Sequence, residues 1–381
     1  MIFQKILRYL RSERLSHKPL IEIFIYRNRL LHNLNQFRSV YPKIKITPVL
    51  KGNAYGHGLL QVARILDGKG VPFLCVDSYF EAVQLRKGGI RSPILVIGYT
   101  LPENIANNRL RDVAFSVMNL GELRALAQLS VPAVIHLKLD TGMHRHGMLP
   151  EELNEALMIL KGSKHLRLEG VFSHFADADT VDSELTRKQI NVWNELVKKV
   201  RREMPAVSSF HIGATAGSFY TNEVTATHIR LGIGLYGFNA SLNTRLELRP
   251  ALEMKTILTS VRSIGPGERV GYNGTFTAEK TMKIASIPVG YAEGVDRRLS
   301  NKGYVSVKGI GCPIVGRVSM NITSIDVSAV PDPKVGDEVV VVSKESDDKN
   351  SIESMSRMCE TISYELLARF PTTLRRTVVY R

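Results

Sequence analysis

The chain has 381 residues, of which 44% are hydrophobic and 23% are charged, so it is long enough for two domains and has the composition of a soluble globular protein. No apolar run approaches the roughly 20 residues that span a bilayer, and three scattered cysteines, Cys75, Cys312 and Cys359, exclude a disulfide framework or a CxxC metal site and suit a reducing cytoplasm. The formal charge of +15 could indicate a nucleic-acid partner, but the basic residues are spread along the chain and no nucleic-acid motif occurs, so we expect an enzyme with a basic surface for anionic ligands.

The chain begins with a basic extension over residues 1–19. It is a poor signal peptide, because no small-residue cleavage site follows a long apolar stretch. Its first 18 residues could form a short amphipathic helix against anionic lipid, which remains an alternative to a simple solvated segment. A strand is expected at 21–26 (IEIFIY), outside the repeat that follows, and it could pair with a second domain.

Between residues 45 and 237, apolar strand-like runs alternate with amphipathic helical stretches such as LLQVARIL and LGELRALAQL. The expected strands are 45–51, 71–76, 92–98, 112–117, 132–140, 166–175, 208–214 and 227–234. Eight such units in about 190 residues predict a (β/α)8 barrel, in a domain covering 20–250, because near-continuous apolar strands suit a parallel sheet covered on both faces. A doubly wound open sheet is the alternative.

After residue 250 the strands follow one another without long helices, which predicts a mainly antiparallel β domain over 251–381. Its expected strands are 252–261, 267–272, 282–291, 304–309, 312–320, 322–328, 335–343 and 377–381. One helical stretch is expected near 351–370.

The chemistry of a (β/α)8 barrel lies at the carboxyl ends of its strands. Cationic and polar residues gather there, namely Lys51, Lys138, Arg145, His174, Thr215 and Arg230. Such a ring suggests an anion site, and a lysine beside phosphate-binding groups suggests pyridoxal phosphate, which needs a lysine for a Schiff base and hydroxyl and N–H groups for its phosphate.

The same residues could also have purely structural roles. Lys51 could be a solvent-exposed charge, Lys138 and Arg145 a surface pair, and His174 a core histidine bonded to a backbone carbonyl. The pair His144 and His146 has no accompanying Cys or carboxylate cluster, so no metal site is expected. The GIGLYG sequence at 232–237 matches a dinucleotide-binding pattern, but no helical pattern follows it, and its glycines are better suited to offer N–H groups to a phosphate.

Seven segments, taken in order, resemble alanine racemases, in a match that runs from about residue 20 to the C-terminus. They are VLKGNAYGHG, KLDTGMHRHG, GVFSHFADAD, RLGIGLYG, VGYNGTF, IPVGYAEGVDRRLS and GRVSMNITSIDV. The resemblance implies a pyridoxal-phosphate barrel followed by a β domain, in agreement with the organisation read from the strands. It further implies a cytoplasmic homodimer with shared active sites that interconverts L- and D-alanine for peptidoglycan.

The resemblance also implies roles for individual residues. Lys51 would form the Schiff base and act as one catalytic base, and Tyr272, working in the partner subunit's site, would be the other. Arg230 would bond the pyridine nitrogen, and His174 would extend this network toward Tyr272.

Further residues would hold the cofactor or line the substrate's place. The phosphate would be held by Tyr55, Thr215, Gly232, Ile233 and Tyr364. Arg145 would contact the cofactor's phenolic oxygen beside the substrate, and Lys138 resembles the lysine that can be carbamylated to hold that arginine. Tyr291 and Met320 would line the substrate's access route from the second subunit.

The chemistry of racemisation fits these roles, because two bases must flank Cα to remove a proton from one face and deliver it to the other. Free lysine and tyrosine titrate near 10, and neighbouring cations such as Arg145 and Arg230 would favour the neutral amine and the phenolate. An arginine facing the pyridine nitrogen would leave that nitrogen unprotonated, which should disfavour transamination.

Some positions depart from the commonest family pattern. Asn321 follows Met320 where many members have aspartate, Leu231 follows Arg230 where proline is usual, and Thr215 replaces a serine. Serine or broad-specificity racemisation therefore remains an alternative, as does a non-catalytic pyridoxal-phosphate-binding protein. A decarboxylase or a D-amino-acid aldolase of the same fold is disfavoured by the VGYNGTF segment.

Overall fold

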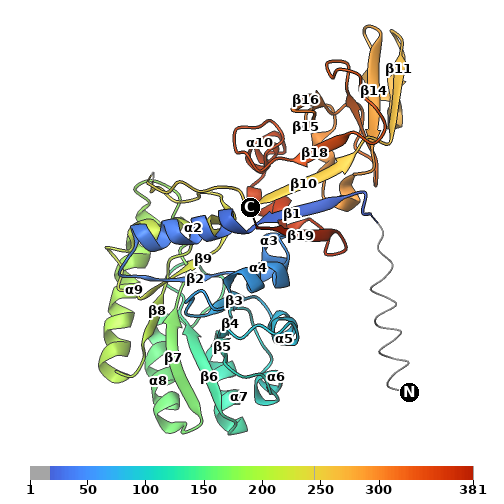
Figure 1. Ribbon diagram of the computed structural model, residues 1–381. Coiled ribbons are helices and arrows are strands. Elements are labelled where there is room, and N and C mark those ends of the chain that lie inside the picture. Colours follow the sequence, from blue (N-terminus) through green and yellow to red (C-terminus); the bar gives the residue numbers. More distant parts are fainter. Residues whose placement is uncertain (1–17, 244, 381) are drawn as a thin grey trace, which may run out of the picture.

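The computed structural model of the protein describes residues 18–243 and 245–380, and it has a barrel and a β domain side by side (Figure 1). The basic segment for which lipid contact was considered lies almost entirely outside the described residues. Among the helices that are described, none is both long and apolar enough to cross a membrane.

Eight parallel strands form the barrel, and each falls within a segment predicted from the sequence. They are β2 (Lys45–Pro48), β3 (Leu74–Val76), β4 (Ile94–Val96), β5 (Val113–Val117), β6 (Ala133–Lys138), β7 (Leu166–Phe172), β8 (Ser209–His211) and β9 (His228–Leu231). Strands β3 to β8 form one sheet, and β2 pairs with β9. The sheet closes on both sides, because the Leu50 amide donates to the Cys75 carbonyl at 2.7 Å and the Thr227 amide donates to the Phe210 carbonyl at 2.8 Å. The doubly wound alternative is therefore wrong.

Helices cover the outside of this barrel (Figure 1). They are α2 (Arg27–Val40), α4 (Leu59–Leu66), α5 (Tyr79–Lys87), α6 (Pro102–Ala106), α7 (Leu120–Leu129), α8 (Leu153–Gly162) and α9 (Glu184–Glu203). The longest, α9, shows why they form. Ser183 caps its first turn by accepting from the Thr186 amide, and the buried residues Ile190, Trp193 and Val197 recur at helical spacing toward the barrel.

The β domain contains a six-stranded sheet in the order β16-β15-β18-β10-β1-β19, a three-stranded sheet β11-β14-β17 and the ribbon β12-β13. The strands are β1 (Glu22–Tyr26), β10 (Leu252–Ile257), β11 (Ser260–Ile264), β12 (Arg269–Val270), β13 (Phe276–Thr277), β14 (Met282–Ile287), β15 (Tyr304–Val307), β16 (Ile310–Pro313), β17 (Thr323–Asp326), β18 (Glu338–Val342) and β19 (Arg375–Val379). The strand expected outside the barrel, β1, does pair here, antiparallel with β10 and parallel with β19.

Three expectations for this domain need correction. The single strand expected at 252–261 is split, because the Leu258 amide donates to the carbonyl of Asp337, directly before β18 of the six-stranded sheet. The next amide, of Thr259, donates to the carbonyl of Ser286 on β14 of the three-stranded sheet. The strand expected at 312–320 is mostly loop beyond Pro313. The helix near 351–370 is two helices, α10 (Ile352–Met358) and α11 (Ser363–Ala368), interrupted where Glu360 adopts a left-handed φ of 52°.

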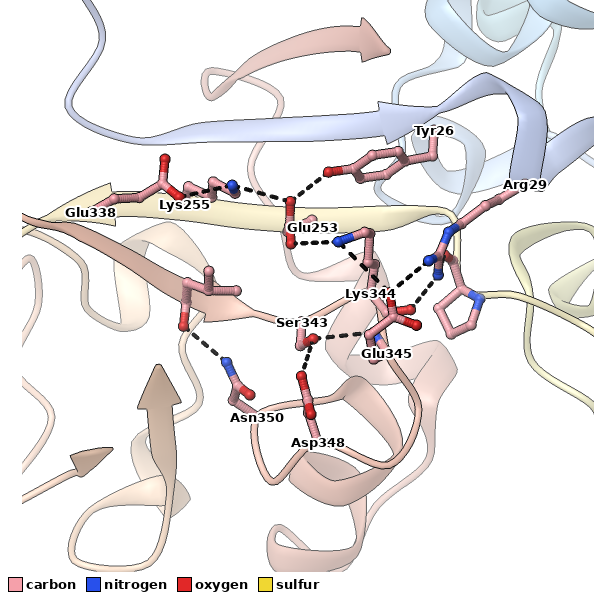
Figure 2. Close-up of polar contacts among 12 residues, drawn as sticks. Tyr26, Arg29, Glu253, Lys255, Glu338, Ser343, Lys344, Glu345, Asp348 and Asn350 are labelled. Atoms are coloured by element: carbon pink, nitrogen blue, oxygen red, sulfur yellow. Dashed lines mark hydrogen bonds and ion pairs between the residues drawn. The ribbon is translucent and has the colours of Figure 1, made fainter. Parts of the chain in front are cut away.

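A polar joint ties the barrel to the β domain (Figure 2). The buried carboxylate of Glu253 on β10 accepts from the Tyr26 hydroxyl at 2.6 Å and from Lys344 Nζ at 3.3 Å. At the start of α2, Arg29 donates to the Lys344 carbonyl at 2.6 Å and to the Glu345 carboxylate at 2.7 Å. Burial, followed by the hydrogen bond to Glu253, raises the pKa of Tyr26, so its hydroxyl remains the donor. The helix α2 of the barrel is thus fixed to the six-stranded sheet of the β domain.

Candidate active site

A cavity of about 1400 Å³ opens at the carboxyl ends of the barrel strands. Ten of the residues singled out from the sequence line it, namely Lys51, Tyr55, Lys138, Arg145, His174, Thr215, Arg230, Gly232, Ile233 and Tyr364. They come from β2, β6, β7, β8 and β9, with their following loops, and from α11 of the β domain. The barrel therefore brings these residues together at the carboxyl ends of its strands, as the predicted topology requires.

Lys51 lies where β2 ends and the chain enters an unusual turn. The four residues that follow, Gly52 to Tyr55, all have left-handed backbone angles, with φ of 63°, 54°, 53° and 51°. Glycine adopts this conformation freely, but each L-residue pays roughly 1–2 kcal/mol for it. The turn brings both Lys51 and Tyr55 to the cavity wall.

Tertiary contacts hold this left-handed turn in place. Glu81 Oε1, from the first turn of α5, accepts from the amides of Gly52 at 2.9 Å and Asn53 at 3.4 Å. The Asn53 side chain in turn accepts from the Leu59 amide at 2.9 Å, at the start of α4. These bonds satisfy backbone N–H groups that a left-handed turn leaves without helical partners.

Arg230 is only 4% exposed and is bonded on both terminal nitrogens. Its Nη1 donates to His211 Nδ1 at 2.7 Å, and its Nη2 donates to the Ser173 carbonyl at 2.7 Å and to His174 Nδ1 at 3.1 Å. Burial lowers the pKa of Arg230 to about 10, which still leaves the guanidinium charged at neutral pH. Burial and then the charge of Arg230 lower the pKa of His174 to about 3, so His174 is neutral and carries its proton on Nε2.

A chain of buried histidines continues from Arg230 through the barrel interior. His211 Nε2 lies 3.0 Å from His136 Nδ1, and His136 Nε2 lies 3.3 Å from Glu169 Oε2. Burial lowers the pKa of both histidines, so both are neutral. The chain ends at Glu169, which is partly exposed and whose pKa is lowered mainly by its hydrogen bond to His136.

The end of β6 and the loop after it carry the two remaining cations, Lys138 and Arg145. Asp140 Oδ1 accepts from the amides of Gly142 at 2.8 Å and Met143 at 2.9 Å, which folds the loop back so that Arg145 reaches the cavity. Burial and then Arg145 lower the pKa of Lys138 to about 8. A substantial fraction of the Lys138 amine is therefore neutral and nucleophilic slightly above neutral pH.

Hydroxyl and N–H groups meet at the other end of the cavity. Thr215 Oγ1 accepts from the Gly234 amide at 3.1 Å, next to the short 3-10 helix Ile233–Tyr236. A Cβ on Gly232 would come within 2.7 Å of Tyr55 Oη, so only glycine leaves room for that hydroxyl. The Tyr364 ring on α11 lies 6.0 Å from the Tyr55 ring, centroid to centroid. Burial raises the pKa of Tyr55, and raises that of Tyr364 to about 12, so both hydroxyls remain donors.

Three of the residues singled out from the sequence do not line this cavity. Tyr272 (70% exposed), Tyr291 and Met320 lie on loops of the β domain and are exposed. The Tyr291 and Met320 loops are neighbours, since the Tyr291 amide donates to the Ser319 carbonyl at 3.0 Å and the Ala292 amide to the Met320 carbonyl at 2.9 Å. One chain thus presents Lys51 in a cavity and Tyr272 on an outer surface.

The sequence reasoning missed several residues that shape the site. Glu81 could have been suspected from Ser78-x-x-Glu81, because a serine followed three residues later by a glutamate is a capping pattern at a helix start. Gln189 on α9 is fully buried and donates to the His174 carbonyl at 3.0 Å and to Thr141 Oγ1 at 3.2 Å. Neither Gln189 nor His211 has a local sequence signal, because only the closed barrel brings them to their partners.

A closed parallel barrel with a polar cavity at its strand ends, joined to a β domain that contributes to the cavity wall, defines a barrel enzyme with an accessory β domain. The chain belongs to the alanine racemase family: the family's N-terminal domain matches residues 25–240 and its C-terminal domain matches residues 251–378.

Known alanine racemases are similar to this protein in sequence and in structure along almost the whole chain. An alanine racemase of Syntrophobacter fumaroxidans is 37% identical over 88% of this chain and 92% of its own length, and alanine racemase 2 of Caldanaerobacter subterraneus is 34% identical over 92% and 93%. Among solved structures, alanine racemase of Clostridium difficile matches with a TM-score of 0.88 and 30% identity, covering 96% of this chain and 97% of that one. The Bacillus anthracis alanine racemase with bound L-Ala-P matches with a TM-score of 0.86 and 29% identity, covering 96% of each chain.

Proposed function

We propose that this protein is a pyridoxal-phosphate-dependent alanine racemase that interconverts L-alanine and D-alanine and so supplies D-alanine for peptidoglycan. The observation that carries the proposal is the cavity that Lys51 lines together with the buried, multiply bonded Arg230 and a group of hydroxyls. Membership of the alanine racemase family over both domains supports the same activity.

The donor set fits pyridoxal phosphate. The cofactor requires an amine, a partner for its ring nitrogen and a cluster of phosphate donors. Lys51 supplies the amine, and Arg230, which can only donate hydrogen bonds, would face the ring nitrogen and keep it unprotonated. The hydroxyls of Tyr55, Thr215 and Tyr364, with the backbone at Gly232 and Ile233, would hold the phosphate. The absence of a side chain at Gly232 lets the Tyr55 hydroxyl lie directly beside this backbone, because a Cβ there would come within 2.7 Å of Tyr55 Oη.

The proposed chemistry assigns a task to each group. When bound, the cofactor would withdraw electrons from the Cα of alanine and so make its proton acidic. Lys51 Nζ would exchange that proton on one face of Cα, and Tyr272 Oη would exchange it on the other. Arg145 would orient the substrate and cofactor from the side, and Lys138 would hold Arg145, most strongly if its neutral amine were carbamylated.

The second base would come from a second copy of the chain. Tyr272, Tyr291 and Met320 are exposed on the β domain and lie outside the cavity of their own chain. A symmetric homodimer would place these side chains against the partner's Lys51 cavity and would complete two sites at once.

The experiment is chiral chromatography of L-amino acids incubated with the purified protein and pyridoxal phosphate, with Lys51→Ala as the control. Conversion of L-alanine to an even D/L mixture by the wild type alone would support the proposal. The same panel ranks alanine against serine and other substrates. Binding of the cofactor without any racemisation would instead favour a non-catalytic carrier.

A further inference from the structure

The left-handed turn after Lys51 requires an external support. Asn53, Ala54 and Tyr55 hold a backbone conformation that side chains disfavour, and Ala54 is fully buried there. Within the turn, the Ala54 amide bonds to the Leu50 carbonyl at 2.7 Å and the Gly56 amide to the Gly52 carbonyl at 3.2 Å. The two amides that immediately follow Lys51 depend instead on a side chain from another unit of the barrel.

We propose that Glu81 is a positioning residue for Lys51. Its Oε1 accepts from the Gly52 and Asn53 amides, and its Oε2 accepts from the Asp77 amide at 2.8 Å. One carboxylate therefore joins the loop after β2 to the loop after β3. Its removal would leave the amides of the turn without partners and would free the backbone that carries the Lys51 side chain.

The next helix but one provides an internal comparison. Glu122 stands at the same place in α7 as Glu81 does in α5, with its amide bonded to the cap residue Asn119 at 2.8 Å. Its Oε2 accepts from the Met118 amide at 2.7 Å, as Glu81 Oε2 accepts from Asp77. The other oxygen of Glu122, however, is buried without a hydrogen-bond partner.

The comparison of Glu81 with Glu122 separates two functions of the Glu81 carboxylate. Capping the start of the helix needs one oxygen, and both glutamates supply it. Only Glu81 uses its second oxygen to reach the segment that carries the cofactor lysine. The role in catalysis rests on the proposed function, whereas the support of the turn does not.

The test compares Glu81→Gln and Glu81→Ala with Glu122→Gln. Hydrogen–deuterium exchange of the peptide covering 50–58 reports on the turn itself, with or without cofactor. Visible circular dichroism of bound pyridoxal phosphate reports on how firmly Lys51 orients it, and steady-state kinetics with L-alanine report on catalysis. Thermal unfolding measures the loss of helix capping, which both glutamates share.

We expect both Glu81 variants to speed exchange at 50–58 about tenfold, to halve the visible dichroism and to lower kcat about 10- to 100-fold with little change in KM, because small misplacements of a reacting group are costly. Glu122→Gln keeps the one side-chain oxygen that accepts from the Met118 amide and does not contact the turn, so we expect the unfolding temperature to stay close to that of the wild type and these three readouts to stay within about twofold of it. Unchanged exchange and dichroism in the Glu81 variants would overturn the inference, as would equal losses in Glu122→Gln. If the wild type racemises no amino acid, the proposed function fails, and the exchange data alone decide whether Glu81 supports the turn.

Discussion

Arg230 Nη1 and His211 Nδ1 are joined by a hydrogen bond of 2.7 Å that fixes which ring nitrogen carries the proton in His211 and in His136. A guanidinium has no acceptor, so His211 Nδ1 must accept, and the neutral ring carries its proton on Nε2. That proton is donated to His136 Nδ1, and His136 Nε2 then donates to Glu169. Because Arg230 can only donate, it determines which atom donates and which accepts in each hydrogen bond from the cavity to the carboxylate of Glu169.

Replacing His211 tests whether this acceptor holds Arg230 in its working position. His211→Phe keeps the ring volume but removes the acceptor, and we expect a fall in kcat of about 10-fold, from the loss of one charge-assisted hydrogen bond. His211→Asn places an amide oxygen near the former Nδ1 and should recover most of this loss. The measurement is kcat for L-alanine in both variants. Equal activity in the two variants would show that the acceptor does not matter.

Buried neutral histidines make the stability depend on pH. Burial lowers the pKa of five histidines, to about 4 for His57 and His228, to about 3 for His174, and below the usual value for His136 and His211. Between pH 6.5 and about 4 the unfolded chain binds these protons and the folded chain does not, so the stability falls as the pH falls.

Two buried carboxylates oppose this trend. Burial raises the pKa of Glu122 to about 7 and also raises the pKa of Glu353, so above the usual glutamate pKa the folded state holds protons on these groups that the unfolded state has lost. Five histidines gain protons on unfolding and two carboxylates lose them in part, so we expect unfolding near pH 5 to take up a net of about three to four protons. Urea unfolding at a series of pH values between 5 and 7 measures this slope. A flat stability over that range would contradict the assignment of neutral histidines.

A mixture of two inactive variants tests whether the site is shared between subunits. Lys51→Ala and Tyr272→Phe should each abolish most racemisation. In a mixed dimer, one site contains the intact Lys51 of one chain and the intact Tyr272 of the other, so random pairing should restore roughly a quarter of the wild-type activity. The assay is racemisation after the two variants are coexpressed. No recovery in dimers shown to be mixed would place both bases in one chain.

The joint around Glu253 should contribute measurably to stability. Glu253→Gln removes the charge that Tyr26 and Lys344 share, and we expect a loss of about 1–3 kcal/mol in the free energy of unfolding. Glu338→Gln is the matched control, because Glu338 pairs with Lys255 at 2.9 Å but its side chain is 64% exposed, and its loss should cost less than about 1 kcal/mol. Urea unfolding at one protein concentration compares the two. Similar losses in the two variants would show that the burial of Glu253 does not increase its contribution to the free energy of unfolding.

The barrel could be predicted from the sequence because its information is local. Each strand is an apolar run that is covered on both faces, and each is followed by a recognisable amphipathic helix. The β domain was harder, since a run such as 252–261 reads as one strand although neighbouring residues bond to different sheets. A sequence pattern records which residues are apolar, but not which sheet an amide bonds to.

In the active site, too, some features could be predicted from the sequence and others could not. Lys51 could be found because it ends a predicted strand within a recognisable segment. The left-handed conformation of Ala54 and Tyr55 could not, because neither residue favours it and the contacts that enforce it come from residues such as Glu81. The partnership of Arg230 with His211 likewise depends on neighbouring strands whose residues are 19 positions apart.

The pairing of β1 with β10 and β19 has a consequence for how the protein is made. Glu22 on β1 lies opposite Lys255 of β10 on one side and Arg375 of β19 on the other. During synthesis β1 therefore cannot pair with β10 until the barrel has been made, nor with β19 until most of the β domain has been made. The barrel is in effect an insertion within the sheet that carries it. During that interval β1 is an apolar strand with both edges open, and such edges are where newly made chains aggregate. The order of translation therefore leaves β1 without its full pair of partner strands until the last strand of its sheet, β19, has been synthesised.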